Sequence, residues 1–376
     1  MLRYHPERFR VTRPYAKQIV NFFRSNISDG IPSMVHLQEL SGMIMKKYNE
    51  ELMKLPFEKR PPDTRQLSKE ISYAVQYATF VMYGRNIFHF EPDLTEKFRQ
   101  TDVDEVPVSA LIYPYKVFYM SFGIQEDLDL WHQGYYVDGA YIAALPGLPL
   151  QIILSTVRKD VDYKDKTNWI TNPDRYYYLA LNIDNPEASI SFVVDQALEE
   201  EIKSHDVSHL PDESGVYEID GQNIMMIDNK HNSAELDISD AKQGFNVFKE
   251  ALRLVINGLC YVTSYREEIK EQWPDETPKL LLERLTNATK NSSRQKIRAE
   301  LTSLGYTKVN FCGRTISKDK VELISSGKEI SAHWRRGHWR NQAYGQGLKD
   351  RKLIWIMPVL VRKDKGEPEL GHIYKP

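Results

Sequence analysis

Hydrophobic positions along the first part of the chain follow the period of an α-helix. Apolar residues recur mostly every three or four positions over residues 15–26, 34–54 and 64–83, which is the spacing of amphipathic helices packed on a core. A fourth, shorter helix is expected at 93–100, just after this part of the chain. We therefore expect residues 1–90 to form a helical N-terminal region.

The pattern then changes to short β-branched and aromatic runs, mostly bounded by Pro, Gly, Asp and Asn, as is typical of strands. These runs cover residues 116–122, 135–143, 150–157, 176–183 and 190–194. A small hairpin is expected where 216–219 and 223–227 flank Asp220-Gly221. A long amphipathic helix follows over 240–265, with an apolar face broad enough for a central core helix. The prediction for 91–278 is an α+β core in which a mainly antiparallel sheet packs on this helix.

The last part of the chain combines both patterns. Two short helices are expected within 278–304, and strands are expected at 308–314, 320–324 and 353–361. Pro358 inside the last run favours an edge position or a break there, because proline cannot donate a ladder hydrogen bond. Residues 279–376 are thus predicted to form a C-terminal α+β module, and the fold class of the whole chain is α+β.

Charge separates this module from the rest. The formal net charge of the 376 residues is only −2. Residues 279–376 hold 21 Lys and Arg against 9 Asp and Glu, a balance of +12, whereas residues 1–278 hold 29 against 43, a balance of −14. A basic cluster of this kind is typical of nucleic-acid contact, although it could also dock on the acidic part of its own chain.

Several common classes of site and location are not indicated. The two cysteines, Cys260 and Cys312, lack the spacing of a zinc site, and the chain has no glycine-rich nucleotide-binding loop. No apolar run reaches the roughly 20 residues of a membrane span, and residues 1–10 lack the apolar core of a signal peptide. We therefore expect a cytoplasmic protein with no cofactor, no metal site and no membrane partner.

The densest chemistry lies at 332–345, where two His-Trp-Arg triplets stand five residues apart. Arginine forks suit phosphates, and indole rings can stack on unpaired bases. We expect a bulged or bent strand around Gly337 with His333 and His338 on one face, since a one-residue bulge there restores the register. The residues predicted to bind nucleic acid are Trp334, Arg335, Arg336, Trp339, Arg340 and Tyr344.

Two other interpretations of this stretch remain open. His333 and His338 could act as the acid and base of a metal-independent ribonuclease, since histidine exchanges protons near neutral pH. The alternating Arg and Trp residues could instead form a cation–π ladder on an amphipathic sheet.

The same stretch resembles the C-terminal motif of a type V-A anti-CRISPR family. The motif is His333-Trp334-Arg335-Arg336-Gly337-His338-Trp339, followed by Tyr344-Gly345 and then by Trp355-Ile356-Met357-Pro358. Weaker similarity extends to Tyr83-Gly84-Arg85-Asn86, to 106–119 and to 248–261.

The resemblance implies a protein carried by phages or other mobile elements, with a mixed helix and sheet fold, that evades a host defence. It implies an inhibitor that lowers production of the CRISPR effector nuclease by acting on the nascent chain and its message. The expected partners are therefore that nascent chain, or another host protein, and RNA.

Overall fold

The computed structural model of the chain describes residues 4–27, 30–60, 66–130, 134–172, 174–205, 215–219, 222–226, 230–304, 306–315 and 333–361. The helices of the first half are α1 (His5–Thr12), α2 (Ala16–Asn26), α3 (Met34–Leu52), α4 (Gln66–Met82), α5 (Pro92–Arg99) and α6 (Asn168–Thr171). Those of the second half are α7 (Ile190–His205), α8 (Lys230–Ser264), α9 (Lys279–Asn287) and α10 (Asn291–Ser303). Short 3₁₀ turns lie at η1 (Phe57–Lys59), η2 (Val108–Ala110), η3 (Arg266–Glu268) and η4 (Gln346–Leu348).

A seven-stranded sheet in the order β6-β5-β4-β3-β1-β10-β9 forms the centre of the molecule. Its strands are β1 (Ile87–Phe90), β3 (Val117–Asp129), β4 (Tyr136–Ala143), β5 (Leu150–Val157), β6 (Tyr176–Leu181), β9 (Lys270–Gln272) and β10 (Val309–Cys312). β1 runs parallel to both of its neighbours, pairing Ile87 with Tyr119 of β3 and with Val309 of β10. The other four pairings are antiparallel.

Three smaller sheets complete the described strands. β12 (Gly337–Tyr344) lies between β13 (Asp350–Ile356) and the two-residue strand β2 (Thr101–Asp102). β11 (His333–Arg335) pairs with β14 (Val359–Val361), and β7 (Gly215–Ile219) pairs with β8 (Gln222–Met226).

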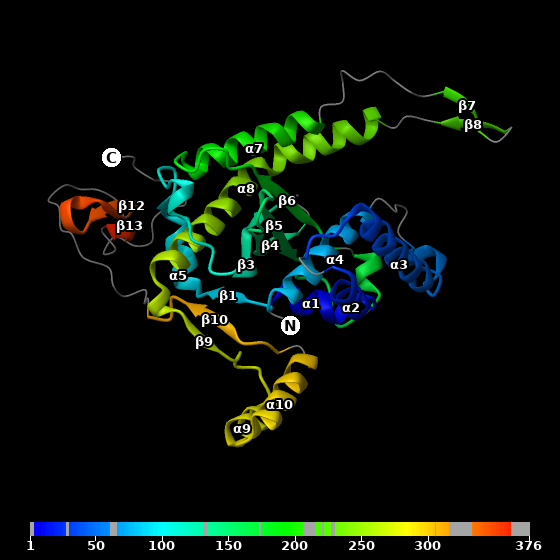
Figure 1. The fold of residues 1–376 in the computed structure, drawn as a ribbon. Coiled ribbons are helices and arrows are strands. Elements are labelled where there is room, and N and C mark those ends of the chain that lie inside the picture. The colour runs from blue at the N-terminus through cyan, green and yellow to red at the C-terminus, as the bar shows by residue number, and fades with distance from the viewer. Residues whose placement is uncertain are drawn as a thin grey trace.

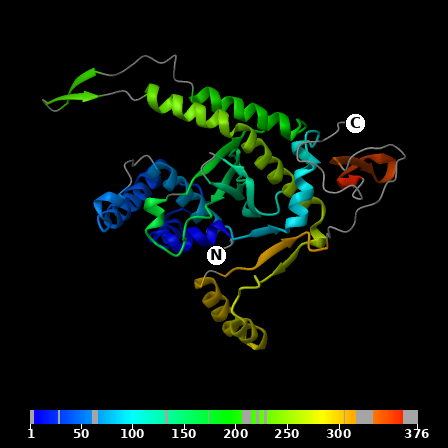
Figure 2. The same cartoon turned by 180° about the vertical axis from the view of Figure 1, so that it is seen from behind.

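Helices cover both faces of the central sheet (Figure 1). Alternate residues of a strand point to opposite faces, so Phe88 and Phe90 join a core with α5, α7 and α8. Ile87 joins a second core on the other face, with α1, α2 and α4. The sheet is therefore the middle of three layers, and the hairpin β7–β8 and the helix pair α9–α10 project away from it in both views (Figures 1 and 2).

The predicted α+β class and the mainly antiparallel sheet are confirmed. Strand β5 matches the predicted run 150–157, and β7–β8 form the predicted hairpin. The core helix α8 begins at Lys230, ten residues before the predicted start, and ends at Ser264. Pro358 does break the final run, because β13 ends at Ile356 and β14 begins at Val359. The predicted strand 320–324 lies outside the described residues.

The strand predicted at 190–194 is wrong, because this segment begins helix α7. Ile190, Val193 and Val194 are buried, as are Ala197 and Leu198 one turn later, so the apolar positions follow a helical period. The Ser189 hydroxyl accepts a hydrogen bond from the Phe192 N–H at 3.2 Å, as an N-cap residue does. Five residues are too few to distinguish a buried strand from a buried helical turn.

Several elements were not predicted from the sequence, among them the short α6, β2 and β9. Helix α1 was not expected, and β1 lies at the end of the range expected to be helical. β1, β9 and β10 place strands from 1–90, 91–278 and 279–376 in one sheet, so the sheet spans the three ranges predicted as domains. Within the described part of the chain, no helix has the length and apolar character needed to cross a membrane.

Candidate nucleic-acid interface

One face of the β12–β13 hairpin packs on the body of the protein. Trp339 and Trp355 stand opposite each other in the ladder, with their rings stacked at a centroid distance of 5.7 Å and an interplanar angle of 13°. Trp355 also contacts Phe98 of α5 and Tyr261 of α8. With only 3% and 6% of their surface exposed, the two indoles attach the hairpin to the larger core.

Asn257 of α8 fixes this attachment with hydrogen bonds. The Trp339 indole N–H donates to Asn257 Oδ1 at 2.8 Å, and the Asn257 amide donates to the carbonyl oxygens of Phe98 and Thr101. The Trp355 indole N–H donates to Thr101 Oγ1 at 3.1 Å. Sequence reasoning did not identify Asn257, although one polar residue within the apolar face of α8 was the available signal.

The opposite face of the hairpin points outward and carries basic, polar and aromatic side chains together with Ile354, Ile356 and Asp350. His338, Arg340 and Tyr344 are exposed, and the first two alternate with the buried Gly337 and Trp339. Lys352 stands diagonally beside Tyr344, with its ammonium 5.2 Å from the ring centroid. Among the described residues, no carboxylate forms an ion pair with Arg340 or Lys352, so both cations are available to an anionic partner.

Trp339 differs from the other residues predicted to bind nucleic acid. Its ring faces Trp355 and Tyr265 in the core and presents almost no surface to a ligand. The doubled triplet therefore does not contribute two exposed indoles. Tyr344 is the aromatic ring of the outward face that could stack on a base.

Arg336 lies in the break between β11 and β12, and Gly337 is the first residue of β12. The Arg336 guanidinium is 3.9 Å from Asp102 of β2, a long and half-exposed ion pair. Gly337 approaches the partner strand closely, because a Cβ there would lie 2.7 Å from Pro358 Cδ and 2.8 Å from the Ile356 carbonyl oxygen. A side chain at 337 would push the two strands apart.

The one-residue bulge predicted at Gly337 is absent from this described stretch. Arg335 pairs with Val359 and His338 pairs with Ile356, so each strand has two residues between these pairs and neither has an extra one. The interruption comes instead from Pro358, which removes a backbone donor. The side chains of His333, Trp334 and Arg335 lie outside the described ones, and the catalytic pair His333 and His338 stays a prediction.

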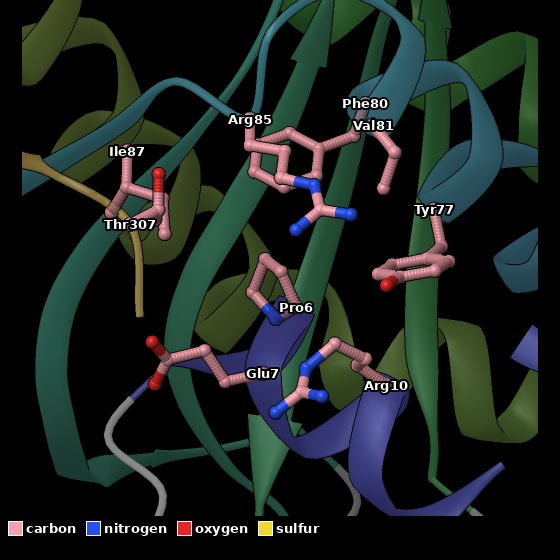
Figure 3. Close-up of a pocket in the computed structure, with 9 residues that line it drawn as sticks. All are labelled: Pro6, Glu7, Arg10, Tyr77, Phe80, Val81, Arg85, Ile87 and Thr307. Carbon is pink, nitrogen blue, oxygen red and sulfur yellow. The ribbon is translucent and has the colours of Figure 1, made fainter. Parts of the chain in front are cut away.

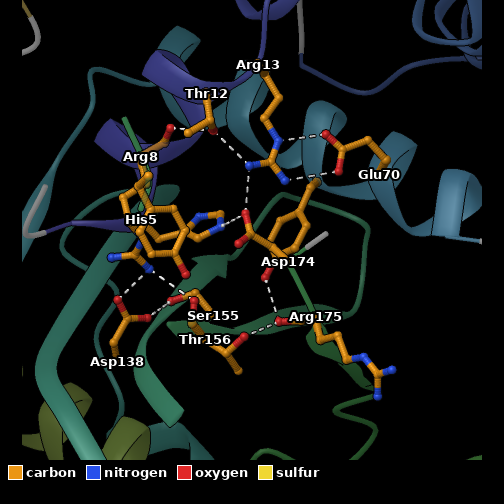
Figure 4. A network of polar contacts seen from close by, with 12 residues as sticks. His5, Arg8, Thr12, Arg13, Glu70, Asp138, Ser155, Thr156, Asp174 and Arg175 are labelled. Atoms are coloured by element: carbon orange, nitrogen blue, oxygen red, sulfur yellow. Dashed lines mark hydrogen bonds and ion pairs between the residues drawn. The ribbon is translucent and has the colours of Figure 1, made fainter. Parts of the chain in front are cut away.

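A second polar cluster, which the sequence did not indicate, lies deep inside the protein around α1 (Figure 4). Arg8 donates to Asp138 at 2.6 Å, and Arg13 forms a two-pronged contact with Glu70 at 2.9 and 3.2 Å. Arg13 also lies 2.9 Å from Asp174. These five charged side chains are all buried, so the cluster joins α1, α4, β4 and the segment before β6 through charges removed from water.

His5 completes this buried ion network. Its Nδ1 lies 2.9 Å from the Tyr141 hydroxyl, and its Nε2 lies 3.4 Å from Asp174 Oδ2. Burial lowers the pKa of His5 below its usual value despite the neighbouring carboxylate. Burial alone would raise the pKa of Asp174, but Arg13 and His5 hold it below its usual range. The charged members are buried and ion-paired, although Arg8 Nε, His5 Nε2 and Asp174 Oδ2 make no hydrogen bond among the described residues, and the arrangement is suited to holding the fold together rather than to binding a substrate.

Among the described residues, no three His, Cys, Asp or Glu side chains lie close enough together to hold a metal ion. Cys260 and Cys312 are both buried and free. Burial raises the pKa of each thiol, which disfavours the reactive thiolate.

The chain is similar to a known protein family and to a solved structure. A model of the family described as "AcrVA2-like: Anti-CRISPR type V subtype A2 family" matches residues 88–363. The solved structure described as "Crystal structure of AcrVA2" shares 14% sequence identity with this chain and has a TM-score of 0.34. The alignment covers 94% of this chain and 95% of that chain. No curated protein matches.

Proposed function

Because this chain belongs to the AcrVA2-like family of type V subtype A2 anti-CRISPR proteins, we propose that it suppresses the biosynthesis of a host CRISPR effector nuclease. In this proposal the protein recognises the effector as its chain is being made, through a segment of the nascent protein, its messenger RNA, or both. It acts in the cytoplasm of the host, where translation takes place, and it is encoded by a phage or another mobile element.

The observation that supports an RNA contact is the outward face of the β12–β13 hairpin. His338, Arg340, Tyr344 and Lys352 lie together on a two-stranded hairpin that the buried indole of Trp339 attaches to α8. Cations without carboxylate partners suit phosphate oxygens, and an exposed tyrosine ring suits an unstacked base. Arg336, at the edge of the same hairpin, could exchange its long contact with Asp102 for a phosphate.

Production of the effector in cells tests the proposal directly. Effector protein and effector message would be measured with wild-type protein, with the double variant Arg340→Ala/Tyr344→Ala, and with Lys46→Ala as a surface control. Lys46 is an exposed cation on α3, outside the hairpin. We expect wild type and the control to lower effector protein equally, and the double variant to restore it. Unchanged effector levels with the wild-type protein would contradict the proposal.

Purified components show which partner is used. Labelled effector message and a peptide from the effector's start would be incubated separately with wild type and with His338→Ala. Binding of intact RNA, of the peptide, or of both identifies the recognised species. Cleavage of the RNA that disappears in His338→Ala would instead identify a ribonuclease.

A further inference from the structure

A small pocket lies between α1, the end of α4 and the start of β1, remote in the sequence from the C-terminal hairpin (Figure 3). Its walls carry Glu7 and Arg10 from α1, Tyr77 from α4 and Arg85 from the turn before β1. Its volume of about 20 Å³ is slightly more than one water molecule needs. The pocket can therefore admit one small polar group, with the rest of a ligand remaining outside.

Positive charge is concentrated at this pocket. Burial lowers the pKa of Arg85 below its usual value, Tyr77 opposes this shift, and the charges of Arg10 and Arg24 lower the pKa further, so Arg85 is repelled by both of these guanidinium groups. Among the described residues, none of the three forms an ion pair with a carboxylate. This contrasts with Arg8 and Arg13, which lie in the same part of the protein and are paired with carboxylates.

The backbone holds Arg85 on the pocket wall in an uncommon conformation. Helix α4 ends at Met82, and the turn after it contains Gly84 at φ 102° and Arg85 at φ 57°, so a non-glycine residue occupies the left-handed region. The Arg85 N–H donates to the Phe80 carbonyl at 3.1 Å. This hydrogen bond closes the end of the helix and fixes the position of the Arg85 backbone. Conformations of this kind cost free energy and are found preferentially at functional sites.

Arg10 faces Arg85 across Pro6, and its side chain is only partly satisfied (Figure 3). One terminal nitrogen donates to the Ser303 carbonyl at the end of α10, at 3.0 Å. Its Nε is buried and has no hydrogen-bond partner among the described residues. A buried donor without an acceptor is unfavourable, and an oxygen atom entering the pocket would supply one.

We propose that this pocket binds the oxyanion end of a small ligand, a phosphate or a carboxylate group, between Arg10 and Arg85. Forked guanidinium donors match the oxygen atoms of either group, and binding would relieve the repulsion among the arginines. The bound anion would also join α1 to the start of the sheet and, through the Arg10–Ser303 contact, to α10. The site lies almost entirely before residue 88, where the family match begins, and it adds a function to the one proposed for the hairpin.

Glu7 is the acidic group of the pocket, and it makes binding depend on pH. Burial raises the pKa of Glu7 to about 7, although Arg10 and Arg8 lower it and Glu276 raises it further. Below pH 7 the protonated carboxyl can donate a hydrogen bond to the anion, whereas above pH 7 its charge repels the anion. Binding should therefore be tighter at pH 6 than at pH 8, and Glu7→Gln should flatten that dependence.

Calorimetric titration of the full-length protein at constant ionic strength tests the site, with inorganic phosphate and acetate as separate probes. The proteins are wild type, Arg85→Gln, Arg10→Gln and the control Arg298→Gln, which removes an exposed cation of α10. We expect saturable binding of at least one probe to wild type and to the control. We expect binding at least tenfold weaker in each pocket variant. The stronger probe identifies the anionic group.

Absence of saturable binding of both probes to wild type would overturn the proposal. So would equal binding by wild type and Arg85→Gln, with circular dichroism showing that both are folded. If Arg85→Gln does not fold, Arg10→Gln and the conservative Arg85→Lys decide the matter, since binding unaffected by both changes rules the site out. The hairpin variant Arg340→Ala should bind the probe normally, so this site and the proposed RNA contact can fail independently.

Discussion

The buried ion network around α1 and the outward face of the β12–β13 hairpin both depend on arginine, but in opposite settings. Arg8 and Arg13 are 1% and 3% exposed and are paired with carboxylates drawn from distant parts of the chain. Arg340 is exposed on a strand where its neighbours in sequence are also polar or aromatic. The first region uses its charges to hold elements together, and the second leaves them available to a partner.

This difference predicts how each region responds to mutation. A charge buried with its partners has already lost its hydration, so removing one partner leaves an uncompensated charge in the interior. Removing an exposed charge costs the protein little stability, because water replaces the contacts of that charge. Substitutions in the network should therefore change stability, whereas substitutions on the outward face should change binding.

The largest effect is expected for Arg13→Ala. The substitution leaves Glu70 and Asp174 buried without their shared cation, and removing one member of such a pair costs about 3–5 kcal/mol. Urea unfolding followed by circular dichroism measures the loss. The exposed Lys46→Ala should show no measurable change. An Arg13→Ala protein as stable as wild type would show that the ion network contributes little to the fold.

A smaller effect is expected where the hairpin attaches to α8. Trp339→Phe keeps a ring in the core but leaves Asn257 Oδ1 without the indole N–H, and an unsatisfied buried acceptor costs about 1–3 kcal/mol. The exposed Tyr344→Phe on the same strand is the control and should melt like wild type. Equal melting temperatures for the two variants would contradict an anchoring role for Trp339.

The contrast also explains what the sequence could and could not predict. His338, Arg340 and Tyr344 of the outward face lie on one strand, so the local density of Arg, His and Trp was enough to make Arg340 and Tyr344 candidates. Lys352 belongs to the neighbouring strand and was not among the candidates. The strand period also separates Trp339 from them, but only the structure shows which side the core occupies. The ion network joins residues from 5 to 174, and no local pattern connects His5 with Asp138 or Asp174.

The secondary structure was likewise predictable where it depends on a local pattern, and not where it depends on distant parts of the chain. The long periodic segment of the core helix α8 was identified as a helix, with its start placed ten residues too late, whereas the four residues of β1 were not predicted. β1 is buried along its whole length between two parallel neighbours, so it has no alternation of apolar and polar residues to reveal it. Its place in the sheet depends on β10, which comes more than 200 residues later.

Protonation of His5 in acid should lower the free energy of unfolding, and the loss should grow gradually as the pH falls. The folded pKa of His5 lies below the usual value of 6.5, so the unfolded chain binds more protons between these two values. Stability is therefore fully present above pH 6.5 and is lost as pH falls toward the folded pKa, by at most about 1.4 kcal/mol per pH unit.

Comparing the stability of wild type with that of His5→Gln isolates the contribution of His5. This comparison is needed because the titration of Glu7 changes the stability in the opposite direction. The raised pKa of Glu7, about 7, favours folding as pH falls through the same range. The difference in unfolding free energy between wild type and His5→Gln should shrink between pH 7.5 and pH 5.5. A constant difference would show that His5 does not titrate differently in the two states.

The smallest effect on stability, and a specific effect on binding, is expected for Arg340→Ala. Arg340 is exposed and forms no ion pair among the described residues, so its removal should change the unfolding free energy by less than about 0.5 kcal/mol. If it contacts one RNA phosphate, the variant should bind single-stranded RNA more weakly. The slope of log affinity against log salt should become shallower by about 0.7, the value for one counterion.

Filter binding from 50 to 300 mM salt measures both quantities, and Lys46→Ala should retain the wild-type slope. A weaker affinity with an unchanged slope would mean that Arg340 contacts RNA at a base or sugar and not at a phosphate. An unchanged affinity and slope would mean that Arg340 does not contact RNA.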